Sequence, residues 1–143
     1  MTEIPSTRRS TATWGGGFRA EVQAGRFAFA VDEPEHSGGT DTGPQPTDYF
    51  LGSLASCFLL ALAWAARKRA IELAPDLAVE VLGTYDGPRF ADLRILVRCS
   101  IAADVIESLL PAAERVCYVS NTLRRPPPIT VESIGSEAGA GTD

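Results

Sequence analysis

An uncharged, mildly apolar run from Tyr49 to Ala66 constrains this chain more than any other feature. A loop rich in glycine and proline precedes it. The cations Arg67-Lys68-Arg69 follow it, where they suit the negative end of a helix dipole. We therefore expect a helix from about Thr47 to Glu72. Because this helix is apolar nearly all round, it has to be covered on all sides. One domain of 143 residues has trouble doing that alone, so we expect a homodimer.

The same run reaches the lower length limit of a membrane-spanning helix. It contains Gly52, Ser53, Ser56 and several alanines, so we expect a buried core helix and no membrane partner. The formal net charge of −5 argues against nucleic acid and against an anionic membrane surface as partners. The segment from Met1 to Trp14 is polar and lacks the apolar core of a signal peptide, so we expect a cytoplasmic protein.

Alternating apolar residues predict strands on both sides of this helix. The runs Thr11 to Val22 and Phe27 to Val31 are interpreted as a hairpin, with Gly25-Arg26 between them. After the helix, Leu77 to Tyr85 and Phe90 to Ile101 are typical of a second pair of strands.

The remaining chain completes an α+β pattern. Asp104 and Glu107 have the spacing of a capping box that opens a second helix, which Pro111 is expected to kink or split. Ile129 to Ile134 is expected to form a last strand. The order ββ-α-ββ-α-β indicates a two-layer α+β fold with an antiparallel sheet. We expect one domain over residues 11–134, with disordered tails at residues 1–10 and 135–143.

Three cysteines, Cys57, Cys99 and Cys117, lie far apart, and none belongs to a Cys-x-x-Cys pair. His36 is the single histidine, and one histidine without paired ligands is a poor metal site. We therefore expect no metal and no cofactor. An odd number of cysteines without a secretion signal fits a reducing compartment, where a thiol stays free or takes part in redox chemistry.

Two motifs carry the chemistry. The first is GGTDTGPQPTDYFLGSLASC at residues 38–57, a glycine and proline loop, then Pro-x-acid, an apolar helix and a small residue before Cys57. The second is AERVCYVSNTL at residues 113–123, around Cys117. In order and separation these motifs resemble those of the OsmC/Ohr family. The resemblance covers roughly Ala12 to Glu132.

This resemblance implies an OsmC-like fold, an interwoven homodimer with buried central helices and active sites at the subunit interface. It also implies a thiol-dependent peroxidase that reduces organic hydroperoxides. Cys57 would be the peroxidatic cysteine, whose thiolate attacks the peroxide and becomes a sulfenic acid. Cys117 would be the resolving cysteine, which condenses with it to a disulfide. The reductant is an unknown thiol, and a dihydrolipoyl protein is one option because the Ohr branch uses lipoylated proteins.

The resemblance also points to a cation and a carboxylate. In Ohr-type members an arginine of the first hairpin pairs with the thiolate, and Arg19 is the best match here, with Arg26 in reserve. A glutamate holds that arginine in the family, and Asp48 takes its place. Nine residues separate Asp48 from Cys57, about 180° around a regular helix. Asp48 is therefore either part of the site, through the arginine or the other subunit, or a first-turn carboxylate that faces the helix dipole.

A second interpretation stays open. Cys57 and Cys117 also suit the packing of buried helices, since free cysteines are often buried. The protein would then be a non-catalytic OsmC-like module that binds an apolar small molecule or acyl group. Cys99 matches neither family cysteine and is interpreted as structural.

Overall fold

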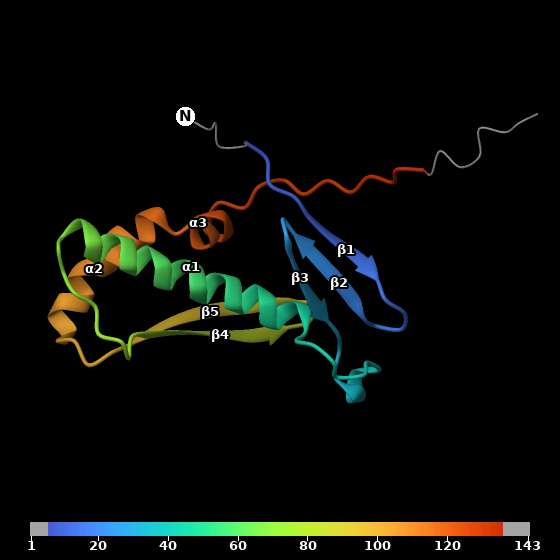
Figure 1. Ribbon diagram of the computed structural model, residues 1–143, viewed down its shortest axis with the longest axis horizontal. Coiled ribbons are helices and arrows are strands. Elements are labelled where there is room, and N and C mark those ends of the chain that lie inside the picture. Colours follow the sequence, from blue (N-terminus) through green and yellow to red (C-terminus); the bar gives the residue numbers. More distant parts are fainter. Residues whose placement is uncertain (1–5, 136–143) are drawn as a thin grey trace, which may run out of the picture.

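The computed structural model describes residues 6–135, and the described chain is a mixed α+β structure with antiparallel sheets, as predicted (Figure 1). Our predicted disorder at residues 1–5 and 136–143 lies outside the described residues. The elements follow the order β1 (Ser10–Trp14), β2 (Ala20–Ala24), β3 (Phe27–Val31), the 3-10 helix η1 (Glu35–Ser37), α1 (Pro46–Lys68), β4 (Ala78–Asp86), β5 (Arg89–Arg98), α2 (Ala103–Val116) and α3 (Tyr118–Arg124).

The N-terminal region forms three strands, so the predicted two-stranded hairpin is wrong. The order in this sheet is β1-β2-β3, and Trp14 pairs with Ala20. Gly16 and Gly17 have φ values of 92° and 55°, a left-handed backbone that suits glycine. They reverse the chain here, which divides the predicted run from Thr11 to Val22 into β1 and β2.

A long loop, residues 32–45, leads from β3 to α1 and includes η1. The helix begins with a capping box, in which the Gln45 side chain accepts a bond from the Asp48 backbone and the Asp48 carboxylate accepts one from Gln45 N at 3.0 Å. The helix ends at Lys68 rather than at the predicted Glu72. Ala70 follows with φ 53°, a left-handed residue that turns the chain out of the helix.

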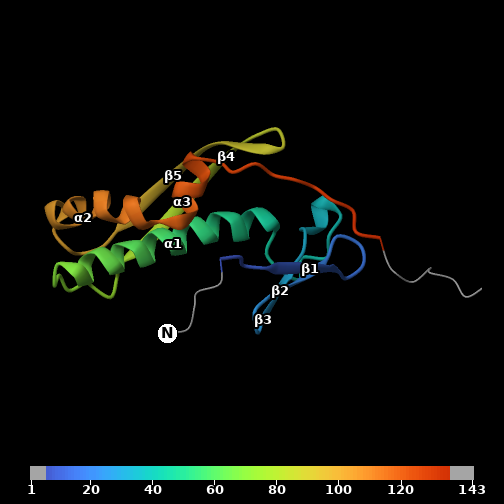
Figure 2. The same ribbon diagram turned by 90° about the horizontal axis from the view of Figure 1, so that it is seen from above.

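One face of α1 builds the core of the helical body, the part of the molecule formed by α1, β4, β5, α2 and α3. Helix α1 packs against the α2–α3 pair and against the β4–β5 hairpin, and both lie on the same side of it in Figure 2. Partly buried residues of β4 and β5, among them Val81 and Ile95, pack against the buried cluster. The cluster consists of Leu54, Phe58, Ala61, Leu62, Ala65, Ala66, Leu109, Ala112, Ala113 and Cys117.

The second predicted helix is confirmed, but its start and its break are not where the sequence suggested. Its N-cap is Ala102, without a side-chain cap bond, so the predicted capping box of Asp104 and Glu107 is not formed. Pro111 lies inside α2, which continues past it. The chain breaks instead at Cys117, whose ψ of 104° is extended rather than helical.

The predicted strand from Ile129 to Ile134 is absent from the described chain. Ile129, Val131 and Ile134 are almost fully exposed, and residues 125–135 form no helix or strand. This segment runs across the end of the body toward the side of β1 (Figure 1). The segment pairs with no strand edge of the described chain, although β1, β3, β4 and β5 each leave one edge unpaired.

The β1–β3 sheet stands apart from the β4–β5 hairpin in both views (Figures 1 and 2). It exposes large apolar side chains, among them Trp14 and Phe27. The face of α1 that carries Leu60 and Trp64 is also exposed. By length and composition α1 would also suffice to cross a membrane, a test that the core helix of a soluble protein passes as well.

Candidate functional site

Cys57 lies on α1, at the border between the buried and the exposed face of the helix. One turn away on either side, Leu54 and Ala61 are buried, while Ser53 and Leu60 are exposed. The Cys57 side chain is partly buried and packs against the core cluster. A small molecule that reaches the open face of α1 therefore meets this sulfur first.

Cys117 belongs to the same cluster but is completely buried. It is the residue between α2 and α3, and its N–H donates to Ala113 O at 3.0 Å. Both cysteines are free thiols. The fold thus brings the two predicted redox residues to one core cluster, with the first accessible and the second protected.

Arg19 lies two residues after the Gly15-Gly16-Gly17 turn and directly before β2 begins at Ala20. The turn fixes its backbone, since Gly15 N donates to Arg19 O at 2.8 Å and Arg19 N donates to Gly16 O at 3.0 Å. The guanidinium donates through Nη1 to Thr42 Oγ1 in the loop before α1. Arg19 is therefore held beside the start of α1.

Asp32 organises this loop, and the sequence analysis missed it. The residue follows β3, and its side chain is 1% exposed. Its Oδ2 accepts hydrogen bonds from the hydroxyls of Thr40 at 2.5 Å and Thr42 at 2.6 Å. Those two hydroxyls hold the pKa of Asp32 well below its usual range, since they favour the charged form. The signal in the sequence was Thr-x-Thr in a glycine-rich loop after a strand that ends in Asp.

Asp48 serves the first turn of α1, where its Oδ2 accepts the bond from Gln45 N. Within residues 6–135, Arg19 forms no ion pair with Asp48. Asp48 is therefore a first-turn carboxylate of α1, which was one of its two predicted roles. The participation of Asp48 in a reaction stays a prediction.

Arg26, the reserve cation, lies at the start of β3 beside the Gly25 turn. Its guanidinium is stacked 4.9 Å from the centre of the exposed Phe27 ring. His36 is exposed in η1. The described residues contain no group of three His, Cys, Asp or Glu side chains that would hold a metal ion.

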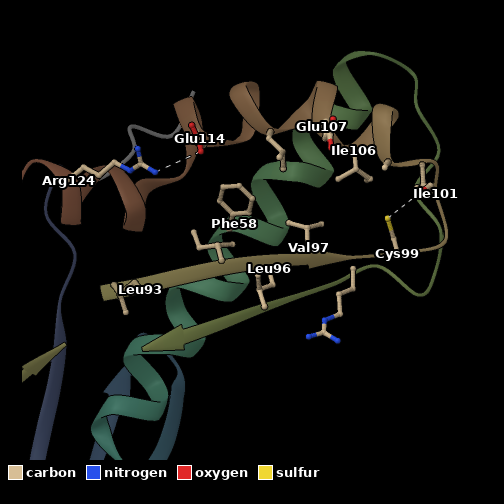
Figure 3. A pocket seen from close by; sticks show the side chains of 14 residues that line it. Phe58, Leu93, Leu96, Val97, Cys99, Ile101, Ile106, Glu107, Glu114 and Arg124 are labelled. Atoms are coloured by element: carbon tan, nitrogen blue, oxygen red, sulfur yellow. Dashed lines mark hydrogen bonds and ion pairs between the residues drawn. The ribbon is translucent and has the colours of Figure 1, made fainter. Parts of the chain in front are cut away.

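Several hollows are lined in part by α1, and two of them bear on the predicted roles. A shallow one of about 600 Å³ runs along its first turns and is lined mainly by apolar atoms, including those of Phe29 and Tyr49, together with Ser53 and Ser56. A cavity of about 750 Å³ lies between β5 and α2, as Figure 3 shows, with Phe58 of α1 at its base. Neither Cys57 nor Cys117 lines the second cavity, whereas Cys99 does.

Within one chain, then, the predicted residues form two separate groups. Cys57 and Cys117 share the core of the helical body. Arg19 and Asp48 lie at the start of α1. Nine residues of helix correspond to an axial rise of about 13 Å between Asp48 and Cys57.

Known proteins share this architecture. A crystal structure of an organic hydroperoxide resistance protein OsmC from Legionella pneumophila has 22% identity, a TM-score of 0.63, and a match over 85% of this chain and 92% of that one. An organic hydroperoxide resistance protein from Elizabethkingia anophelis has 23% identity and a TM-score of 0.64, and the match covers 87% of this chain and 93% of that one. An uncharacterised protein of Haloferax volcanii is 24% identical over 111 residues, which are 76% of this chain and 80% of that protein. Residues 39–132 match the OsmC-like protein family, and the chain therefore belongs to this family.

Proposed function

We propose that this protein reduces organic hydroperoxides through a two-cysteine cycle, with Cys57 peroxidatic and Cys117 resolving. One observation carries the proposal: a partly accessible thiol packs against the cluster that contains a second, fully buried thiol. A peroxide from solvent can reach the first sulfur but not the second. The exposure of the two thiols thus matches the order in which the cycle uses them.

The chemistry needs no bound cofactor. The Cys57 thiolate attacks the outer oxygen of the hydroperoxide ROOH, and the O–O bond breaks. The alkoxide leaves and takes up a proton as ROH, while the sulfur becomes a sulfenic acid. The Cys117 thiol then attacks this sulfur, releases water and forms a disulfide. An external dithiol, in our proposal a dihydrolipoyl protein or another cellular thiol, restores the two thiols and is itself oxidised.

We assign the cation of the site to Arg19 and propose that a homodimer completes the site. Arg19 is fixed beside the start of α1, a long way along the helix from Cys57 of its own chain. A second copy packed on the open face of α1 would bring its own β1–β3 sheet against that face. The arginine of one chain would then approach the thiol of the other, where a positive charge favours the thiolate.

The exposed apolar surface supports the dimer. Large side chains on the sheet, on α1 and in the C-terminal segment have no cover in the described chain, although such patches are rare on monomers. They include Trp14, Phe18, Phe27, Leu60, Trp64, Ile129, Val131 and Ile134.

The structural neighbours and a hollow beside α1 bear on the substrate class. Two of the structural neighbours are named organic hydroperoxide resistance proteins, which fits a role in the oxidative stress response. Cys57 does not line the hollow beside α1, but its neighbour Ser56 does, and the apolar lining of this hollow suits an alkyl hydroperoxide better than hydrogen peroxide. We propose a cytoplasmic protein, because a reducing compartment returns the disulfide to thiols.

The decisive experiment is stopped-flow consumption of an alkyl hydroperoxide, followed by thiol titration. We expect wild-type protein to lose two thiols per equivalent of peroxide and to form a Cys57–Cys117 disulfide, identified by peptide mass spectrometry. Cys57→Ser should consume no peroxide. Cys117→Ser should stop at the sulfenic acid, and Cys99→Ser is the matched control with full activity. Peroxide consumption by folded Cys57→Ser at the wild-type rate would refute the proposal.

A binding role is the alternative, and the cavity between β5 and α2 favours it (Figure 3). Apolar side chains such as Ile95 and Leu110 line it, but about half of its lining is polar, and the Glu114–Arg124 pair at 3.8 Å is among the lining residues. A cavity of this size and mixed lining suits a small molecule that has an apolar body and a polar group. Native mass spectrometry of gently purified protein distinguishes the two roles. A stoichiometric ligand, with thiols that do not react with peroxide, would support binding.

A further inference from the structure

Asp32 accepts five hydrogen bonds from the loop that follows β3. Besides the two threonine hydroxyls, it accepts bonds from the backbone N–H groups of Glu33 at 2.8 Å, Thr40 at 3.3 Å and Thr42 at 3.1 Å. This set fixes the carboxylate in one orientation and holds the loop around it. Glu33 O also lies where a Cβ on Gly39 would clash, at 1.8 Å, so the loop is closely packed there.

The direction of the bonds links Asp32 to Arg19. A threonine hydroxyl has a single proton, and that of Thr42 is donated to Asp32 at 2.6 Å. The lone pairs of the same oxygen are left to accept the bond from Arg19 Nη1. A hydroxyl that donates to an anion is a stronger acceptor, because hydrogen bonds in a chain polarise one another. Asp32 thus strengthens the bond that holds the guanidinium.

No other carboxylate holds Arg19 within residues 6–135. Asp48, where the sequence predicted such a partner, accepts the Gln45 N–H of the helix cap. We propose that Asp32 is a positioning residue that fixes the Arg19 guanidinium through the Thr42 hydroxyl. This deepens the proposed function, since it rests on Arg19 serving as the cation for Cys57.

The intervening hydroxyl has a chemical consequence. A carboxylate in direct contact with the guanidinium would offset much of its positive charge. With Thr42 between them, Asp32 orients Arg19 but leaves more of that charge for a thiolate. The Gly15–Arg19 turn fixes the backbone of the same residue, so the cation is held from both ends.

Two matched substitutions test this inference. Thr42→Val removes the hydroxyl at nearly constant shape, and Thr42→Ser keeps it, at a position that is exposed and so tolerates either side chain. Both are measured by kcat/KM for an alkyl hydroperoxide, in the wild-type and in the Arg19→Ala background. We expect Thr42→Val to lose roughly tenfold to a hundredfold, as for a lost hydrogen bond to a charged group. Thr42→Ser should stay close to wild type.

The double-mutant cycle separates positioning from a general effect on the loop. In the Arg19→Ala background, Thr42→Val and Asp32→Asn should cause no further loss, because the residue they act through is gone. Additive losses in that background, or full activity of Thr42→Val with Arg19 present, would overturn the inference. Should Asp32→Asn fail to fold, the Thr42 pair alone decides.

Failure of the proposed function is distinguishable from failure of this inference. If wild-type protein consumes no hydroperoxide, the first proposal falls, and the same variants are compared by the rate at which iodoacetamide alkylates Cys57. A slower rate in Thr42→Val, restored in Thr42→Ser, supports the positioning role without any turnover. Equal rates in all variants contradict it.

Discussion

The helical body and the N-terminal sheet of this protein differ in how far one chain completes them. In the body, α1, α2 and the β4–β5 hairpin surround a shared cluster, and Leu62 and Leu109 are fully buried. In the β1–β3 sheet the backbone bonds are complete, but Trp14 and Phe27 remain exposed. The body holds both thiols of the proposed cycle, and Arg19, the proposed cation, directly precedes β2 of the sheet. In our proposal the site therefore requires a second chain, whereas the core does not.

Substitutions in the two regions should therefore behave differently. Leu109→Ala should lower the free energy of unfolding by about 2–5 kcal/mol, because it leaves a cavity in a completed core. In an isolated protomer Phe27→Ser should change stability by less than about 0.5 kcal/mol, since this ring is 64% exposed. In the proposed dimer the same change should release monomers.

Urea denaturation measures the first effect, and light scattering coupled to size exclusion, over a range of protein concentrations, measures the second. Ala28→Ser, beside Phe27 and also exposed, is the matched control for a polar change on β3. Wild-type protein that stays monomeric at high concentration would contradict this difference between the body and the sheet, because the exposed face of the sheet would then need no second chain.

The second prediction concerns the cation on the sheet. Arg19→Ala should reduce kcat/KM for an alkyl hydroperoxide by about 100-fold, the order expected when one charged stabilising group is removed from a site. Arg26→Ala is the control, since Arg26 is stacked on Phe27 in the same sheet and has no bond to the loop. Stopped-flow kinetics measure both. A larger loss in Arg26→Ala than in Arg19→Ala would reverse the assignment.

The sequence predicted the body better than the sheet, for physical reasons. Helix α1 and the β4–β5 hairpin follow from local periodicity and from the turn at Gly87-Pro88. The predicted single strand over Thr11 to Val22 missed the turn within it, although Gly16 and Gly17 adopt a left-handed backbone easily. The missing last strand, Ile129 to Ile134, shows that an apolar alternation does not by itself produce a strand, because this segment pairs with none of the free edges of the described chain.

The site was predictable to a similar, partial extent. Cys57 and Cys117 were predicted from the resemblance of their two motifs to the OsmC/Ohr family, but their common cluster depends on packing that periodicity alone does not give. Asp32 was missed because its partners lie eight and ten residues away in a loop without regular spacing. The break at Cys117 rather than at Pro111 is also a tertiary effect, since Cys117 is buried at that point.

A third prediction concerns the negative charge of Asp32. This residue follows β3, and its carboxylate binds Thr40 and Thr42 of the loop before α1. The bonds from Thr40 and Thr42 hold the pKa of Asp32 well below its usual range. Its contribution to stability is therefore complete above the pKa of an unfolded aspartate, about 3.9, and is lost as the pH falls from there through the lower folded value. Asp32→Asn should destabilise the protein at pH 7, and the difference from wild type should narrow below about pH 4.

Urea titrations of both proteins at several pH values check this dependence. Asp41→Asn is the control, because Asp41 is exposed in the same loop and its left-handed φ of 53° suits asparagine. A difference between wild type and Asp32→Asn that stays constant from pH 7 to pH 3 would show that the carboxylate acts by shape rather than by charge.

The smallest effect is expected at Asp48, in the first turn of α1. Its carboxylate accepts the Gln45 N–H, so Asp48→Ala should lower the free energy of unfolding by about 1 kcal/mol, the usual value of a lost cap. Asp48→Asn keeps an acceptor oxygen and should recover most of that loss. The Asn variant also isolates the charge: if its kcat/KM equals that of wild type, Asp48 serves the helix alone. If kcat/KM falls while stability is retained, the carboxylate belongs to the site with Arg19, and the body contributes more to the chemistry than its two sulfurs.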